Sequence, residues 1–343
     1  MKDLIDYNKL KREFDDCYRP MYFFHDDPDG LCSFLLCYKY VGEGVGIPIK
    51  SMPVIDLKFV SKVQYYQPDK IFVLDIANIN QDFIDNVKTS IVWVDHHDLV
   101  KRDKVIIFNP REKFPDIYIP ATYLCYKTLG GLDWINMVGC VGDHYLPSET
   151  KEFLENYPDL ISKAQTKDID KVKFDSKLGI LVEVFSFILK GNTPDIKKTV
   201  KVLTRIKTPY EILEQKTAAG KYVWKQYEKV RNYYLPYWNV ASKIKPKKKV
   251  VLFEYVSNKF TFASDIATRL SHKYRKCLII VARRADDEFR GSLRTRNGDF
   301  KNILPKALEG IRGHGGGHEK AAGFVVKIED FNQFVENLTK LIN

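Results

Sequence analysis

The chain has 343 residues, of which 45% are hydrophobic and 29% are charged. This balance excludes a largely disordered chain, and the length suits two domains better than one. The net charge of +11 is uneven, because residues 245–343 contain 20 Lys and Arg against 11 Asp and Glu. A basic C-terminal third indicates a polyanionic partner, and nucleic acid is the leading candidate.

Neither a secretion signal nor a membrane span is expected. The first eleven residues are charged and contain no apolar run. The longest apolar stretch, residues 178–189, contains Glu183 and is too short to cross a bilayer, so a buried helix is predicted there. The six cysteines are scattered without a CxxC pair, which favours reduced, buried thiols. We therefore expect a cytoplasmic protein with no membrane partner.

The first half of the chain predicts an α/β domain. Four short apolar runs are expected to be strands, at residues 21–24, 70–75, 90–95 and 104–108. Helical patterns are expected at residues 30–41, 121–129 and 132–141. The strand runs are apolar throughout rather than alternating, which is typical of a parallel sheet covered on both faces. The predicted N-terminal fold is therefore a doubly wound, mostly parallel sheet.

The middle of the chain, residues 149–238, is predicted to be mostly helical. One long helix is expected over residues 210–234, interrupted at Gly220 and ended by Pro236. The lysine-rich segment 245–249 is then expected to be a linker.

A second, smaller α/β domain is expected from Val250 onward. Within it, a glycine loop should join a helix over residues 302–309 to a strand over residues 323–328. The chain is thus expected to consist of a catalytic domain over residues 1–190, a helical connector over 191–245 and a substrate-binding domain over 246–343.

Acidic residues and histidines gather at the ends of the predicted strands. They are His25, Asp27 and Asp29 after the first strand, Asp75 after the second, Asp95, His96 and His97 after the third, and Asp143 after the helix over 132–141. A single aspartate at such a point is usually a helix cap or a turn former. Three strand ends that carry clustered Asp and His are hard to explain as caps. Ligands of open α/β sheets bind beyond the carboxyl ends of the strands, so these side chains predict one site.

The residue types in this site favour metal-dependent chemistry at phosphorus. Carboxylates and neutral imidazoles together bind Mn²⁺ and similar divalent ions. Two such ions about 3.5–4 Å apart stabilise the attacking and leaving oxygens of a displacement at phosphorus. They also activate water, so no serine or cysteine nucleophile is needed. The expected cofactor is a pair of Mn²⁺ ions, with Mg²⁺ or Co²⁺ as alternatives.

The ordered set of motifs resembles the N-terminal motifs of DHH phosphoesterases. The motifs are His25-x-Asp27-x-Asp29-Gly30, Asp75, Asp95-His96-His97 and Asp143. The form of the first motif is similar to that of archaeal RecJ-like nucleases. The resemblance implies that His25 and Asp27 bind one metal, that Asp29, His96 and Asp143 bind the other, and that Asp75 bridges the two. It further implies that Asp95 orients a motif histidine and that His97 acts on the scissile phosphate, as a phosphate contact or a leaving-group acid.

A second constellation lies in the C-terminal domain. Glycines let backbone amides approach a phosphate and form an anion nest, and an arginine can bind phosphate through two nitrogens. The alternative is a flexible glycine loop without a ligand. The Ser-Leu-Arg and Gly-Gly-Gly-His-x-x-Ala-Ala-Gly motifs resemble the DHHA1 domain, which implies a nucleic-acid-binding domain that faces the metal site across a cleft. The substrate contacts expected on this basis are Arg294, Arg296, Gly315, Gly316, Gly317 and His318.

These features predict a RecJ-like exonuclease that hydrolyses single-stranded DNA or RNA from an end. The nearest alternative is an enzyme of small substrates, such as an oligoribonuclease, a pAp phosphatase or a cyclic dinucleotide phosphodiesterase. A different alternative is a replication-complex partner of the Cdc45 type, although such proteins have lost metal ligands. A family II inorganic pyrophosphatase ranks lower, because it does not need the Ala-Ala-Gly-containing domain. Replication or repair proteins are candidate partners.

Overall fold

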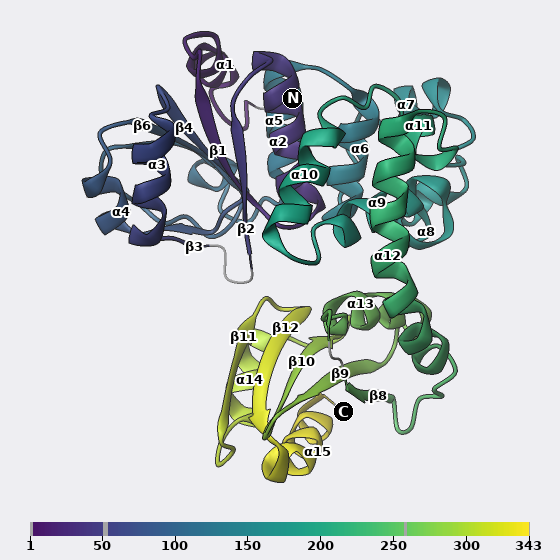
Figure 1. The fold of residues 1–343 in the computed structure, drawn as a ribbon. Coiled ribbons are helices and arrows are strands. Elements are labelled where there is room, and N and C mark those ends of the chain that lie inside the picture. The colour runs from purple at the N-terminus through teal and green to yellow at the C-terminus, as the bar shows by residue number, and fades with distance from the viewer. Residues whose placement is uncertain (1–2, 51–53, 257–258, 343) are drawn as a thin grey trace. The chain divides into compact units, whose positions relative to one another are not determined.

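The computed structural model describes residues 3–50, 54–256 and 259–342 (Figure 1). The chain divides into two compact units, Met1–Glu228 and Lys229–Asn343. Each unit contains its own β-sheet with packed helices, so the α/β fold class is confirmed. Residues 191–228 belong to the first unit. The expected three-part division, with boundaries after residues 190 and 245, stays a prediction.

The main sheet of the first unit contains five strands. Their spatial order is β2 (Val45–Ile49), β1 (Pro20–His25), β4 (Lys70–Leu74), β6 (Ser90–Val94) and β7 (Val105–Phe108). All neighbouring strands pair in parallel, which confirms the doubly wound sheet. The chain moves outward from β1 to β2 and then returns to the other side of β1 at β4. The order therefore reverses between β1 and β4, and such a switch point opens a crevice at the carboxyl ends of the strands.

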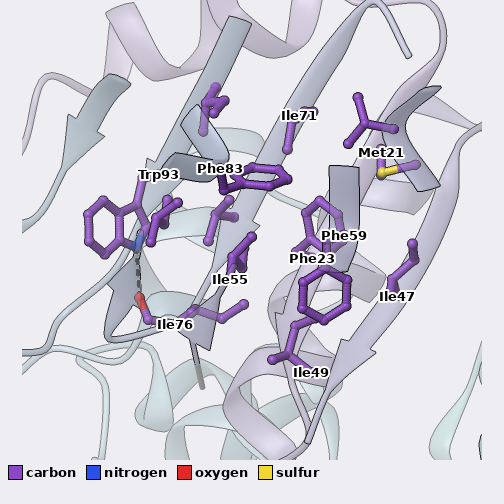
Figure 2. Packing of buried hydrophobic residues seen from close by; sticks show 14 of the residues in the cluster. Met21, Phe23, Ile47, Ile49, Ile55, Phe59, Ile71, Ile76, Phe83 and Trp93 are labelled. Atoms are coloured by element: carbon purple, nitrogen blue, oxygen red, sulfur yellow. Dashed lines mark hydrogen bonds between the residues drawn. The ribbon is translucent and has the colours of Figure 1, made fainter. Parts of the chain in front are cut away.

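Alternate residues of β1 explain why its sequence is apolar throughout. Met21 and Phe23 join a buried cluster on the face covered by α3 (Val60–Tyr66) and α4 (Gln81–Asn86) (Figure 2). Tyr22 and Phe24 point to the opposite face, where their rings contact Phe34 of α2 (Pro28–Val41). Burying each such side chain contributes about 1.5–3 kcal/mol. The sheet is therefore held from both faces, and its edge is a rigid base for a site.

The indole N–H of Trp93, in the buried cluster that contains Met21 and Phe23, has a hydrogen-bond partner. Trp93 lies on β6, and its ring nitrogen donates a hydrogen bond of 2.8 Å to the backbone oxygen of Ile76 (Figure 2). A buried indole N–H without a partner would destabilise this packing. The bond also ties the turn after β4 to the neighbouring strand.

The remaining helices of the first unit cover the second face and extend the fold beyond it (Figure 1). They are α1 (Tyr7–Asp15), α5 (Ala121–Leu129), α6 (Asp133–Gly142), α7 (Thr150–Asn156), α8 (Ile169–Asp175), α9 (Lys177–Ile188), α10 (Thr193–Leu203), α11 (Pro209–Leu213) and the start of α12 (Ala218–Ala241). A small parallel pair is formed by β3 (Val54–Ile55) and β5 (Asn78–Ile79). The buried helix that was predicted over residues 178–189 is α9. Among the described residues, no helix combines the length and the apolar character that crossing a membrane requires.

The predicted helix over residues 210–234 is wrong in two respects. Its break comes before Gly220, at a turn in which Gln215 has a left-handed φ of 53°. Gly220 lies inside α12, where a Cβ atom would come within 1.7 Å of the Glu211 backbone oxygen. The glycine therefore permits close packing of α12 against α11 and does not interrupt the helix. Pro236 also lies inside α12, which continues to Ala241.

The second unit contains a five-stranded mixed sheet. The strand order is β11 (Gly313–Gly317), β12 (Ala321–Lys327), β10 (Glu288–Arg294), β9 (Leu278–Ala285) and β8 (Val250–Val256). Only β8 and β9 pair in parallel. The helices that pack with this sheet are α13 (Ala263–Lys273), α14 (Phe300–Ala307) and α15 (Phe331–Ile342).

The expected glycine loop is an edge strand. Residues Gly313–Gly317 form β11, which pairs antiparallel with β12. A Cβ atom on Gly315 would lie 2.7 Å from the Gly323 backbone oxygen and 2.9 Å from Leu304 Cδ2 of α14. The glycine sequence therefore allows close approach of the strand to its neighbours, whereas it was predicted to form a loop whose backbone amides approach a phosphate.

Candidate metal centre

The carboxyl edge of the main sheet brings together the residues that were predicted to form one site. His25 ends β1, while Asp75 and Asp95 directly follow the adjacent strands β4 and β6. Asp143 reaches the same place from the end of α6. The site therefore lies at the switch point between β1 and β4.

The first group of potential ligands contains His25, Asp27 and Asp75. The Nδ1 atom of His25 lies 3.0 Å from Asp27 Oδ2 and 3.4 Å from Asp75 Oδ2. The buried His25 Nδ1 and Asp75 Oδ2 atoms nevertheless have no hydrogen-bond partner with suitable geometry among the described residues. Two unsatisfied lone-pair atoms that converge on one point fit a divalent cation.

The second group contains Asp29, His96 and Asp143. His96 Nε2 lies 3.5 Å from Asp143 Oδ2 and 3.9 Å from Asp29 Oδ2. It also lies 3.2 Å from Asp75 Oδ1. In each group the potential ligand atoms lie within 4.8 Å of one another. Asp75 thus directs one oxygen toward His25 and the other toward His96, between the two groups.

Local backbone structure positions the acidic residues of the first motif. Asp27 is the N-cap of α2, and its Oδ1 accepts a hydrogen bond of 2.9 Å from Gly30 N. This leaves Oδ2 directed at His25. A Cβ atom on Gly30 would come within 2.4 Å of the His25 backbone oxygen, so only glycine permits this approach of helix to strand.

Asp29 is fully buried and held by the N-terminus of α5. Its two oxygens accept hydrogen bonds of 2.9 and 2.8 Å from the backbone N–H groups of Ala121 and Thr122. Free N–H groups and the helix dipole favour a negative charge at that end of a helix. The carboxylate is therefore fixed before any ligand binds.

Asp95 fixes the orientation of His97. Its Oδ1 lies 2.8 Å from His97 Nδ1, and its Oδ2 accepts the backbone N–H of His97 at 3.0 Å. Burial alone would lower the pKa of His97, but its hydrogen bond to the Asp95 carboxylate and the negative charge of that group raise it. Because Nδ1 is engaged, Nε2 is the ring nitrogen left to contact a ligand.

The electrostatics of the site call for a cation. Burial raises the pKa values of Asp29 and Asp75 well above the usual range, and neighbouring carboxylates add to the effect. Burial would lower the pKa of His25, but the carboxylates of Asp27 and Asp75 outweigh it and raise that pKa well above its usual value. Without a metal, His25 is therefore protonated and supplies a positive charge to the site. A bound metal would displace this proton and supply the positive charge instead. The donor set therefore fits divalent metal ions.

Tyr118 is a site residue that sequence reasoning missed. Its hydroxyl donates a hydrogen bond of 2.9 Å to Asp143 Oδ2, and its ring packs edge-on against His96 at 5.0 Å. It precedes α5 in a loop with no motif, so no pattern in a single sequence indicates this role. His144, the residue after Asp143, instead directs its ring at Lys173 and Asp170 of α8.

The predicted substrate residues of the second unit lie around one end of its sheet. Arg294, the last residue of β10, pairs with Ala321, and Gly317 of β11 pairs with Ala322. The His318 backbone N–H donates to the Ala321 oxygen at 2.7 Å. Gly315, Gly316, Gly317 and His318 are exposed, as is Arg296. Because Gly313–Gly317 is extended, it does not form the expected nest of successive amides. Its role in substrate contact stays a prediction.

The Arg294 guanidinium is held by neutral groups. It donates to the hydroxyls of Ser264 and Thr268 on α13, at 2.7 and 3.1 Å. Burial lowers its pKa to about 10, so the group remains charged at neutral pH. Hydroxyl partners orient the charge without neutralising it, which suits an anion-binding arginine.

Comparison with known protein families finds one match in each unit. Residues 21–128 match the DHH family, N-terminal domain, and residues 249–343 match the DHHA1 domain. The chain therefore contains a DHH domain followed by a DHHA1 domain, as the motifs predicted. No curated protein sequence matches it.

Three solved structures share the fold at low sequence identity. RecJ in complex with Mn²⁺ from Thermus thermophilus is 14% identical with a TM-score of 0.66, and the alignment covers 99% of this chain but 54% of that one. Exonuclease RecJ bound to manganese is 12% identical with a TM-score of 0.62, covering 99% and 94%. The pGpG-specific phosphodiesterase PggH from Vibrio cholerae is 16% identical with a TM-score of 0.51, covering 95% and 99%. The chain thus spans about half the length of Thermus RecJ and shares its DHH/DHHA1 fold. The archaeal branch stays a prediction.

Proposed function

We propose that the chain is a divalent-metal-dependent phosphodiesterase that hydrolyses single-stranded DNA or RNA from one end. The position of Asp75 between the two ligand groups is the observation that carries this proposal. A carboxylate with one oxygen on each side is what a pair of ions held close together requires. The RecJ structures with Mn²⁺ support manganese as the natural ion, with Mg²⁺ or Co²⁺ as alternatives.

The residues of the site would have separate roles in metal binding, catalysis and substrate binding. His25 and Asp27 would hold one ion, Asp29, His96 and Asp143 the other, and Asp75 both. When bound, the ions supply Lewis acidity and activate water for attack on phosphorus. Asp95 holds His97 so that its Nε2 can contact the scissile phosphate or protonate the leaving oxygen. In the second unit, Arg294, Arg296, His318 and the glycines Gly315, Gly316 and Gly317 would bind the phosphate backbone.

Digestion of end-labelled strands tests this function. With Mn²⁺, the wild-type chain should release nucleotides from one end of 5′- or 3′-labelled single strands, and EDTA should stop the reaction. Labels at both ends, on DNA and RNA, also determine the polarity and the preferred nucleic acid. An Asp29→Asn or Asp95→Ala chain that keeps the wild-type rate would show that the catalytic site is elsewhere.

A small-substrate phosphodiesterase is the second candidate. It is favoured by the similarity to PggH, whose length this chain matches almost fully. Strands of graded length separate the two functions. A rate that collapses beyond a few nucleotides would reject the exonuclease and support an oligoribonuclease, a pAp phosphatase or a cyclic dinucleotide phosphodiesterase. A purely structural role of the Cdc45 type is disfavoured, because the potential metal ligands are all present.

A further inference from the structure

Lysines concentrate on two neighbouring helices of the first unit. Lys198 and Lys201 on α10 and Lys221 and Lys225 on α12 are exposed, and Tyr222 of α12 lies half-buried between them. We call these five residues the α10–α12 surface. The ammonium group of Lys198 lies 5.4 Å from the centre of the Tyr222 ring, so α10 and α12 contact each other at this surface. Residues three or four apart on a helix share a side, which places each lysine pair together.

The positive charge of this surface is local. Residues 197–225 contain eight Lys and Arg against two Asp and Glu, a net charge of +6. Residues 1–244 as a whole carry only +2, so the rest of that segment is net negative. A general excess of basic residues in the protein therefore does not explain the cluster.

The two acids in this segment do not neutralise the lysines of the surface. Glu211 accepts hydrogen bonds from the backbone N–H groups of Lys207 and Thr208 and from the Thr217 hydroxyl. Glu214 pairs with Lys216. Both carboxylates are thus engaged in the turns before and after α11. The charge of the α10–α12 surface remains available to an external anion.

A further lysine connects this surface with the metal centre. Lys50 follows β2, and its ammonium group donates to the backbone oxygen of Gly191, two residues before α10 begins. Ile49, the residue before Lys50, pairs with His25 of the metal centre. Lys50 therefore places a positive charge between the rim of the metal centre and the start of α10.

We propose that the α10–α12 surface binds the phosphate backbone of a single nucleic-acid strand whose end occupies the metal centre. This inference rests on the proposed function and narrows its substrate to strands longer than a few nucleotides. An anionic membrane is the less suitable partner, because binding at a bilayer interface needs exposed apolar side chains. Of the described residues 190–225, none is among the exposed large hydrophobics.

The test replaces the four lysines by glutamine, which removes charge but keeps helix propensity. In the full chain, Lys198→Gln, Lys201→Gln, Lys221→Gln and Lys225→Gln are combined. The KM for a strand of about 20 nucleotides should rise about tenfold or more at low salt. The slope of log Kd against log salt, measured by fluorescence anisotropy, should fall by about 3, since each phosphate contact contributes about 0.7 for single strands. Hydrolysis of a dinucleotide should stay within about twofold of the wild-type rate.

A matched control removes the same charge elsewhere in the first unit. Exposed lysines on other elements are replaced, in a chain with Lys9→Gln, Lys11→Gln, Lys88→Gln and Lys151→Gln. This chain should keep the wild-type KM and salt slope. An unchanged KM in the α10–α12 variant, or an equal loss in the control, would overturn the inference. So would a variant that keeps strand binding but loses binding to vesicles of anionic lipid.

The design separates failure of the surface from failure of the proposed function. If the wild-type chain hydrolyses neither the strand nor the dinucleotide, the proposed function fails. The anisotropy measurement still tests the surface in that case, because binding needs no turnover. If the wild-type chain hydrolyses both substrates and the variant matches it on both, only the inference about the surface is wrong.

Discussion

Replacement of Asp75 by asparagine should have opposite effects on the metal-free and the metal-loaded protein. Asp75 is 1% exposed and has a left-handed φ of 55°, a conformation that Asn adopts as readily as Asp. Among the described residues, no backbone N–H donates to its carboxylate, and Oδ2 has no hydrogen-bond partner. The substitution therefore keeps the turn and the volume while it removes a poorly compensated charge.

The raised pKa of Asp75 determines whether the substitution raises or lowers the stability of the metal-free protein. The pKa of the Asp75 carboxyl group is higher in the folded than in the unfolded state. Such a group destabilises the folded protein once the pH rises above the unfolded pKa of about 3.9, and this destabilisation persists at neutral pH. Removing such a buried charge should stabilise the metal-free protein by about 2 kcal/mol, because desolvation costs several kcal/mol and His25 and His96 offset part of it. For a unit of this size, that corresponds to a Tm increase of about 4–8 °C.

Thermal denaturation with EDTA or with Mn²⁺ measures both effects. Wild-type protein should gain about 2.7 kcal/mol when the ion is present at a hundredfold excess over its Kd, and Asp75→Asn should gain little. Asp26→Asn is the matched control, since Asp26 is adjacent to His25 but belongs to neither of the two ligand groups, and it should keep the full Mn²⁺ gain. If Asp75→Asn lowers the Tm in EDTA, or keeps the wild-type Mn²⁺ gain, the reasoning about this carboxylate is refuted.

Three further predictions concern catalysis, substrate binding and the glycine strand. Asp95→Asn should lower kcat at least about tenfold, because it disturbs the orientation of His97. It should leave the Mn²⁺-induced Tm shift intact, because it removes no proposed metal ligand. Loss of the Tm shift would show that Asp95 contributes to metal binding. Arg294→Gln should raise KM about tenfold with little change in kcat, measured in Mn²⁺ at low salt, and a pure kcat effect would contradict a binding role. Gly315→Ala should lower the stability of the second unit by about 1–3 kcal/mol in urea denaturation, whereas Gly316→Ala should have little effect, since a Cβ atom there meets nothing within 4 Å.

The sequence predicted that these acidic residues and histidines lie close together because strand ends are strongly marked. Apolar runs end at His25, Asp75 and Asp95, and parallel strands carry these ends to one edge of the sheet. Residue type, order and this topology sufficed to predict which side chains would converge. The edge strand β2 was not predicted, because Gly46 and Pro48 interrupt its apolar pattern, and only its edge position makes proline acceptable there.

The contacts that hold the site could not be predicted in the same way. The partners of Asp29 are the backbone amides of Ala121 and Thr122, which lie more than 90 residues away and carry no side-chain signature. Tyr118 stands in a loop whose path depends on the packing of α5. The strand β11 was predicted to be a loop, since five residues with four glycines have low strand propensity. At Gly313, Gly315 and Gly317 a Cβ atom would come within 2.7 Å of a β12 backbone oxygen, so glycine permits the close approach to β12 there. In each of these cases tertiary packing decides a feature that local sequence does not encode.

The acidic residues of the site differ in how far the protein compensates their charge. Asp27 receives the Gly30 N–H and lies beside His25, Asp29 receives two amides of α5, and Asp95 receives two donors from His97. Asp75 lies between the two ligand groups, and no backbone N–H of residues 3–50, 54–256 or 259–342 donates to it. The fold therefore supplies hydrogen-bond donors to Asp27, Asp29 and Asp95 and leaves the central carboxylate without a backbone donor, although burial raises the pKa of both Asp29 and Asp75. It follows that metal affinity should be most sensitive to substitution at Asp75, although every carboxylate of the centre has the same residue type.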